Sequence, residues 1–225
     1  IAPPNAGSLD TLDSLVNGME LSFLLPTYHP GLVGTMDSMY ELLPRDRNRP
    51  IVLKGKEKNV SLYNVELWDK FNWGLLDEQA DKVLKKLFPS VKSKKLRKKQ
   101  AKKVLDAKLK RAKKFHTLID TPATPPKQLK FYLMAGDAIP TKESYVVSSE
   151  GEFLSQKEGV GDGVVLRESA LMDERVSGPW RPFLKSPIGW QDVYLYFNEH
   201  LTLTRDSTFT NNLLFLLLEF DSERL

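Results

Sequence analysis

The spacing of apolar residues predicts helices in the first 120 residues of the chain. Leucines at positions 9, 12 and 15 form the stripe of a short helix over 8–18, which Ser8 or Asp10 can cap and Gly18 can end. A second short helix is expected over 36–43, and helical spacing resumes from position 75 until Pro89. The longest predicted helix covers about 20 residues. Its apolar stripe is formed by Ala101, Val104, Leu105, Leu109, Ala112 and Phe115.

Strand patterns replace helical spacing after the proline-rich segment 121–128. The run LKFYLMAG (129–136) is short and nearly all apolar, which is typical of a strand buried on both faces in a parallel sheet. Residues 144–156 predict a hairpin that turns at Glu150-Gly151, and QDVYLYFN (191–198) predicts a second buried strand. The stretch 209–219 is expected to form a largely buried helix, capped by Ser207 or Thr208. This order of elements predicts the last units of an α/β fold.

Composition and charge indicate a globular body with one strongly basic segment. The chain of 225 residues is 41% hydrophobic, which is enough for a substantial core. Although the net charge is +4, 13 of the 33 lysines and arginines lie between Lys92 and Lys114, where the only acidic residue is Asp106. The remainder of the chain is therefore acidic.

Other features of the composition limit the compartment without fixing it. The absence of cysteine excludes disulfides and thiolate metal sites, and it is consistent with a reducing compartment such as the cytoplasm. The longest apolar run, 213–218, is far too short to span a membrane, and the first residues lack a signal-peptide pattern. We therefore expect a soluble protein.

Two residues are candidates for acid–base chemistry. His200 directly follows the strand predicted over 191–198, and functional groups of open α/β sheets gather at the carboxyl ends of strands. Asp162 lies upstream on a loop, between two glycines. An acid followed by a histidine after the last strand is the chain order of the α/β-hydrolase triad. The alternatives are a surface Asp-Gly turn and a surface histidine, and Asp137 and Asp192 are rival acids.

Six segments resemble, in order, parts of lipases similar to lecithin:cholesterol acyltransferase, which are α/β hydrolases. The segments are IAPPNAGS (1–8), TMDSMYELLPR (35–45), SLYNVELWDKFNWGLL (61–76), FHTLIDTP (115–122), GVGDGVVLRESAL (159–171) and NEHLTLTRDSTFTNNLLFLLLE (198–219). The resemblance implies the C-terminal part of an α/β-hydrolase fold, with Asp162 as triad acid and His200 as triad base. It further implies a core segment over 1–49, a helical cap insertion with the basic helix over 50–120, and a C-terminal α/β core over 121–225.

The sequence departs from this family in one respect, because the nucleophile elbow G-x-S-x-G is absent. In the family the elbow precedes the segment that IAPPNAGS resembles, and the oxyanion-hole donors are associated with it or with an earlier loop. We therefore expect the nucleophilic serine to come from a segment upstream of Ile1 or from another chain. The first residue is not methionine, in agreement with an upstream segment.

The resemblance implies a serine ester hydrolase or acyltransferase that acts on lipid-like esters. The sequence does not distinguish hydrolysis from acyl transfer. A soluble esterase or amidase for small substrates is one alternative. A second alternative, from a different class, is a non-catalytic interaction module that binds anionic surfaces through its basic helix.

The basic segment Lys92–Lys114 and an aromatic cluster each have several interpretations. The segment is either a solvated helix or a surface for an anionic membrane or acidic partner; nucleic acid is not expected, because no aromatic residue interrupts the lysines. Trp68 and Trp73 either pack the insertion on the body or bind substrate as an apolar wall. The segment 177–183 is interpreted as shaping a loop. No cofactor or metal is expected, because the sequence lacks phosphate-loop, dinucleotide and metal-spaced motifs.

Overall fold

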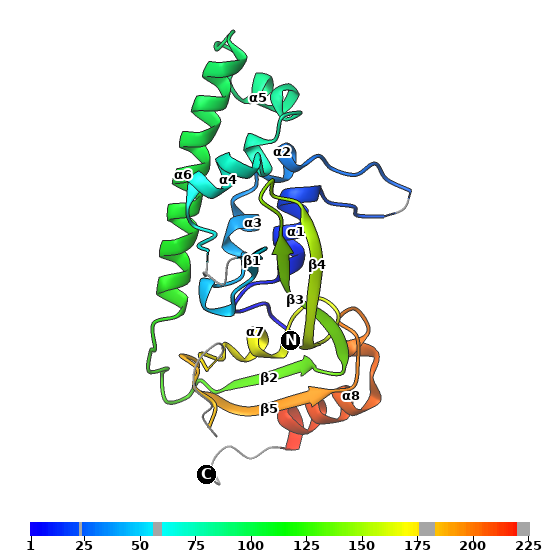
Figure 1. The fold of residues 1–225 in the computed structure, drawn as a ribbon. Helices are drawn as coiled ribbons and strands as arrows, with labels where there is room; N and C mark the ends of the chain where they lie inside the picture. Colours follow the sequence, from blue (N-terminus) through cyan, green and yellow to red (C-terminus); the bar gives the residue numbers. More distant parts are fainter. Residues whose placement is uncertain (23, 56–59, 176–182, 220–225) are drawn as a thin grey trace.

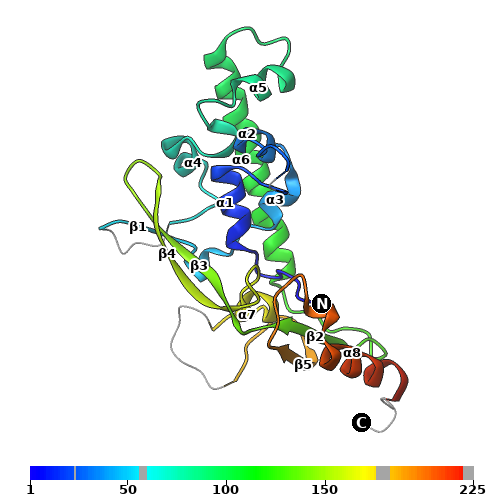
Figure 2. The same ribbon diagram turned by 90° about the vertical axis from the view of Figure 1, so that its right-hand side faces the viewer.

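The computed structural model of the protein describes residues 1–22, 24–55, 60–175 and 183–219, so most of the predicted loop 177–183 lies outside the described residues. The fold is mixed α/β, as predicted, and its strands form two small sheets (Figure 1). The helices lie beside the first sheet, whose β3–β4 hairpin projects away from them, and the second sheet lies at one end of the molecule together with the last helix (Figures 1 and 2).

The first sheet has the strand order β1-β3-β4. Its strands are β1 (Ile51–Leu53), β3 (Ile139–Val147) and β4 (Phe153–Gly161). β3 and β4 are antiparallel and form the predicted hairpin, which is longer at both ends than the sequence pattern indicated. β1 runs parallel to β3. The second strand of the hairpin, β4, leads directly into the glycine-flanked loop that holds Asp162.

The second sheet consists of two parallel strands, β2 (Phe131–Gly136) and β5 (Trp190–Tyr196). Both predicted strands are thus present, and they pair in parallel with each other. Residues 133–136 of β2 are buried as predicted. The prediction of a second buried strand was wrong for most of β5, which is only partly buried, with Leu195 39% exposed. Because parallel strands point the same way, the loops after β2 and β5 emerge at the same edge of this sheet.

Short helices and one long helix make up most of the first part of the chain. They are α1 (Leu9–Asn17), α2 (Pro30–Val33), α3 (Asp37–Glu41), η1 (Asp46–Asn48), α4 (Val65–Phe71), η2 (Gly74–Leu76), α5 (Asp81–Leu87) and α6 (Lys94–Ile119). The prediction for α1 is confirmed in detail: Ser8 accepts a hydrogen bond from the Asp10 amide at the N-cap, and Gly18 ends the helix with φ of +97°. Figure 1 shows α6 along one edge of the molecule.

The main hydrophobic core lies between α6 and the first sheet. It contains Leu12 and Tyr40 from the N-terminal part, Leu105 from α6, and Tyr145 from β3. These residues come from all three predicted regions, so this core does not divide at residues 49/50 or 120/121. Side chains of the segment 50–120 therefore pack in the same core as side chains from 1–49 and 121–225.

Helix α6 is 26 residues long and buries one face. The buried side chains are Arg97, Ala101, Leu105, Leu109, Ala112 and His116. The predicted stripe is confirmed at Ala101, Leu105, Leu109 and Ala112, whereas Val104 is only partly buried. At its end Phe115 is 38% exposed and His116 takes the buried position. The step of four residues from Ala112 to His116 keeps the side chain on the buried face of the helix.

A second, smaller core joins the second sheet to the end of the chain. It includes Met134 and Tyr196 from the strands, Ala170 from α7 (Arg167–Leu171) and Phe209 from α8 (Ser207–Leu214). Between β5 and α8 the chain makes a turn of 3₁₀ helix, η3 (Leu203–Arg205). This core holds the β2 and β5 ends in place.

The sequence prediction for the closing helix was wrong in two respects. Its N-cap is Asp206, whose carboxylate accepts hydrogen bonds from the amides of Thr208 and Phe209, so neither Ser207 nor Thr208 caps it. The helix continues as a π-helical turn, η4 (Phe215–Glu219), and is mostly exposed rather than buried: Leu217 and Leu218 are 70% and 77% exposed. In the described part of the chain, none of the helices has both the length and the apolar character needed to cross a membrane.

Candidate functional site

Asp162 lies immediately after β4, and the fold holds its carboxylate by backbone amides. Oδ1 accepts hydrogen bonds from the amides of Val164 at 3.0 Å and Val165 at 2.7 Å. The next residue, Gly163, has φ of +91° and donates its amide to Thr141 Oγ1 at 2.9 Å. The residue is only 1% exposed, and the two amide donors satisfy the hydrogen-bonding capacity of Oδ1 in this buried position.

His200 follows β5 and makes two contacts with Asp162. Its Nδ1 lies 2.8 Å from Asp162 Oδ2, and its backbone amide donates to the Asp162 carbonyl oxygen at 2.8 Å. The ionised carboxylate can only accept, so Nδ1 carries the proton of the neutral imidazole and Nε2 has the free lone pair. The side chain is 29% exposed, and no described residue bonds to Nε2. The predicted pairing of Asp162 with His200 is therefore present in the structure.

The contact between these two loops requires a glycine at the end of β2. A Cβ added to Gly136 would lie 2.3 Å from the backbone oxygen of Asn198 and 2.7 Å from the Asp162 Cβ. Any side chain here would push the histidine loop or the aspartate loop away. The sequence does not predict this requirement, because it arises from two loops that are far apart in the chain and meet on either side of Gly136.

The loop of Asp162 is also attached to the first residues of the chain. Ser8 Oγ donates to the Val164 carbonyl at 2.8 Å, and Ser169 Oγ donates to the Gly7 carbonyl at 2.6 Å. Both hydroxyl groups are buried and serve the fold, and neither contacts His200. The Ala2 amide donates to the Met134 carbonyl at 2.7 Å, so the first residues lie beside β2, on the edge opposite β5.

The rival acids and the other two histidines lie outside this pair. Asp137 contacts Arg167, with 3.3 Å between the carboxylate and the guanidinium, and Asp192 lies in β5. His29 caps α2: its Nδ1 accepts from the Gly31 amide at 3.0 Å. Of the acids considered from the sequence, Asp162 is the one that contacts His200.

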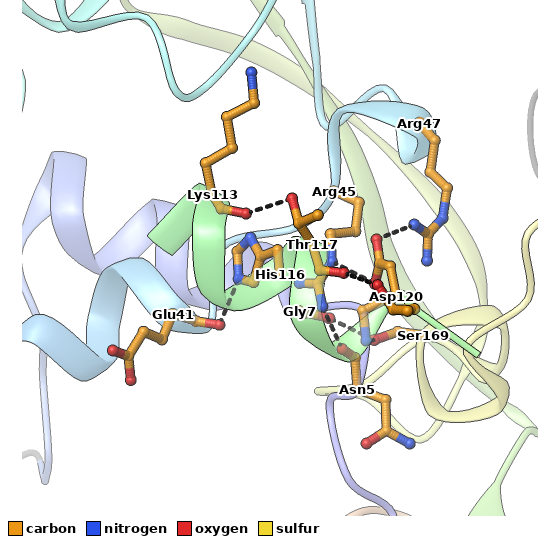
Figure 3. A network of polar contacts seen from close by, with 12 residues as sticks. Asn5, Gly7, Glu41, Arg45, Arg47, Lys113, His116, Thr117, Asp120 and Ser169 are labelled. Atoms are coloured by element: carbon orange, nitrogen blue, oxygen red, sulfur yellow. Dashed lines mark hydrogen bonds and ion pairs between the residues drawn. The ribbon is translucent and has the colours of Figure 1, made fainter. Parts of the chain in front are cut away.

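His116 belongs to a buried polar network at the end of α6 (Figure 3). Its Nε2 lies 2.7 Å from the Glu41 carbonyl oxygen, and its Nδ1 lies 2.6 Å from the Tyr63 hydroxyl. Because a carbonyl can only accept, Nε2 carries the proton and Nδ1 accepts from Tyr63. Burial, assisted by the positive charge of Arg45, lowers the pKa of His116 from 6.5 to about 4. The imidazole is therefore neutral near pH 7.

Two arginines complete this network around Asp120. Arg45 Nε and Arg47 Nη1 lie 3.2 Å and 2.6 Å from the two carboxylate oxygens of Asp120 (Figure 3). Arg45 also donates to the Asn5 carbonyl at 2.9 Å. The network thus ties the end of α6 to the segment that leads to α1. This network was not predicted from the sequence, although a histidine spaced like the buried residues of the helix indicates a buried polar site.

The two tryptophans proposed to bind substrate lie in the main core. Trp68 and Trp73 are 0% and 3% exposed, and their indole nitrogens donate to the carbonyls of Leu62 at 2.8 Å and Gly151 at 3.0 Å. Phe71 packs against Trp73, with ring centroids 4.9 Å apart. These positions agree with the packing interpretation. The structure does not bring either tryptophan together with Asp162 and His200.

The candidate site is therefore an Asp–His pair at adjacent loop ends, with an imidazole nitrogen open to the surroundings. Such a pair can accept and return a proton, and the carboxylate stabilises the imidazolium that forms. Among the described residues, no cluster of three or more histidines, aspartates or glutamates could hold a metal ion. Comparisons with protein-family models and with curated proteins found no match to this chain.

Proposed function

We propose that this protein provides the acid and the base of a serine hydrolase triad, in the C-terminal part of an α/β-hydrolase fold. The observation that carries the proposal is the Asp162–His200 pair, with 2.8 Å between Oδ2 and Nδ1 and an Nε2 that no described residue occupies. The ordered resemblance to lecithin:cholesterol acyltransferase-like lipases supports the same assignment. The proposed substrates are lipid-like esters.

In this mechanism His200 Nε2 removes the proton from a serine hydroxyl as the oxygen attacks the ester carbonyl. The imidazolium then gives this proton to the leaving alcohol, and an acyl-enzyme remains. Water completes a hydrolysis, and an acceptor alcohol completes an acyl transfer, with His200 acting again as base. Asp162 remains ionised throughout, because two amides and the histidine hold its oxygens.

The nucleophilic serine is proposed to come from a segment upstream of Ile1 or from another chain. Neither Ser8 nor Ser169 is available, because their hydroxyls donate to carbonyls within the loop framework. The contact of Ala2 with β2 supports an upstream strand along the same edge, since a strand there would end close to the aspartate and histidine loops.

The test uses the gene product, including any residues encoded before Ile1, together with a fluorophosphonate that labels activated serines. The wild-type protein should be labelled and should hydrolyse p-nitrophenyl esters of increasing acyl length. His200→Ala should abolish labelling, and Asp162→Asn should lower the turnover number by about 10⁴, as loss of the orienting carboxylate does in serine proteases.

Asp137→Asn is the matched control, because it removes a neighbouring carboxylate that contacts Arg167 instead of His200. It should leave labelling and turnover within a few-fold of wild type. The proposal is wrong if the full gene product resists labelling, or if His200→Ala hydrolyses esters as well as the wild type does. A preference for long acyl chains would support a lipase, and a preference for short ones a small-ester hydrolase.

A further inference from the structure

Helix α6 uses its basic residues in two different ways. Those directed toward the body have partners: Arg97 binds Asp81, Lys102 binds Glu66 and Asp69, and Lys108 and Arg111 bind Asp37. Lys98 donates to the Asn72 side chain at 2.7 Å. The fold itself therefore accounts for these charges, and they need no external partner.

A second set of lysines faces away from the body. We call Lys95, Lys99, Lys103 and Lys114 the outer lysine row; all four are exposed, and none has a hydrogen-bond or ion-pair partner in the described part of the chain. At 1.5 Å per residue the row extends for about 29 Å along the helix axis. In Figure 1 the neighbouring elements lie on one side of α6, which leaves its other side uncovered.

This arrangement is unfavourable for an isolated helix. Lys95, Lys99 and Lys103 follow one another at intervals of four residues, and like charges at that spacing repel. The acidic residue within α6, Asp106, is paired with Lys110, so it does not neutralise the row. A solvated face usually mixes both signs of charge. The row is therefore a concentrated positive surface that an extended anionic partner would stabilise.

Apolar residues on the same face indicate which anionic partner fits. Leu96 and Leu118, near the two ends of α6, are 54% and 65% exposed. From the helical spacing, both lie on the half of the helix that carries the outer lysine row. A face with lysines and exposed leucines suits the interface of a lipid bilayer, where ammonium groups reach the headgroups and leucines enter the acyl boundary.

We propose that α6 docks this protein on an anionic phospholipid membrane, with the helix lying along the surface and the outer lysine row facing the headgroups. The row consists of lysines alone, whereas the arginines of α6 face internal carboxylates, and planar bidentate recognition of a specific phosphate is better served by arginine. The convex helix also lacks the aromatic stacking platform that single-stranded nucleic acids use. The proposal does not rest on the proposed catalytic function.

The experiment measures binding of the full chain to vesicles of phosphatidylcholine, with and without phosphatidylglycerol. Wild-type protein should bind only the vesicles that contain phosphatidylglycerol, and added salt should weaken binding. Each lysine near such a surface contributes about fivefold in binding, so replacing all four lysines of the outer lysine row with glutamine should weaken it several-hundred-fold. Glutamine has a helix propensity similar to that of lysine, and circular dichroism would verify that α6 is intact.

The matched control removes four exposed lysines elsewhere, by Lys54→Gln, Lys70→Gln, Lys82→Gln and Lys86→Gln. It changes the net charge equally and should keep most of the binding. Failure of the wild type to bind the anionic vesicles, or equal losses in both variants, would overturn the proposal. Tighter binding to duplex DNA than to vesicles at the same salt, lost in the outer-row variant, would overturn the lipid assignment. His200→Ala should bind as wild type, which separates this result from the catalytic proposal.

Discussion

Replacing His116 with glutamine is expected to make the fold less sensitive to acid. The imidazole is 2% exposed and faces Tyr63, Arg45, Arg47 and Asp120. Its pKa of about 4 in the folded protein is caused first by burial and then by the positive charge of Arg45. Glutamine can keep both hydrogen bonds, because its amide can donate to the Glu41 carbonyl and its oxygen can accept from Tyr63. It cannot take up a proton.

The sign and size of the effect follow from the two pKa values of His116. In the unfolded chain the pKa has its ordinary value of 6.5, and in the folded protein it is about 4. Below pH 6.5 the unfolded chain binds a proton that the folded protein does not, so the free energy of unfolding decreases as the pH falls. At 1.36 kcal/mol per pKa unit, the loss is about 2 kcal/mol at pH 5 and reaches about 3.4 kcal/mol below pH 4.

Urea unfolding, followed by tryptophan fluorescence, would measure this loss for wild type and His116→Gln at neutral pH and near pH 5. Subtracting the free energy of unfolding of the wild type from that of the variant at each pH removes the contributions of all other titrating groups. Between neutral pH and pH 5, the free energy of unfolding should fall by about 2 kcal/mol less in the variant than in the wild type. If the difference between the two proteins is independent of pH, His116 does not remain neutral in the folded state and the reasoning fails.

Three further substitutions test the packing of the fold by urea unfolding. Gly136→Ala should cost about 1–3 kcal/mol, because its Cβ would clash with backbone, whereas Gly189→Ala, which would meet no atom within 4 Å, should be nearly neutral; equal effects would contradict the close approach of the loops. Leu109→Ala should lower the free energy of unfolding by about 2–5 kcal/mol, because it leaves a cavity in the core. Leu118→Ala, at an exposed position of the same helix, should lower it by less than about 0.5 kcal/mol. Similar losses in the two variants would refute the orientation of α6. Ser8→Ala should cost about 1 kcal/mol through loss of the α1 cap, and no change would contradict that role.

Features fixed by local periodicity were predictable from the sequence. The leucine stripe of α1, the long α6, the hairpin and the two strands β2 and β5 each follow a pattern of apolar positions that predicts their type of element. The pairing of Asp162 with His200 was predicted from the chain order of an acid before a histidine, both on loops after strands. The two strands belong to different sheets, β4 to the first and β5 to the second, so the meeting of their loops did not follow from one sheet edge.

The remaining features depend on contacts between distant segments. Hydrophobicity alone favoured Phe115 as the last buried residue of α6, whereas Tyr63 and the Glu41 carbonyl supply the partners that allow His116 to be buried there. The cap of α8 could be any of three adjacent polar residues, and Asp206 is chosen by where the first turn begins. The exposure of this helix could not be predicted, since an apolar run does not specify which of its faces another element covers.

The internal ion pairs of α6 have a consequence for the order in which the chain is synthesised. The acidic partners of its inward-facing charges, Asp37, Glu41, Glu66, Asp69 and Asp81, all precede the helix in the sequence. When α6 leaves the ribosome, its binding partners have therefore already been made. The inward-facing charges of α6 can therefore be paired as soon as the helix forms, before the strands that follow it in the sequence are made.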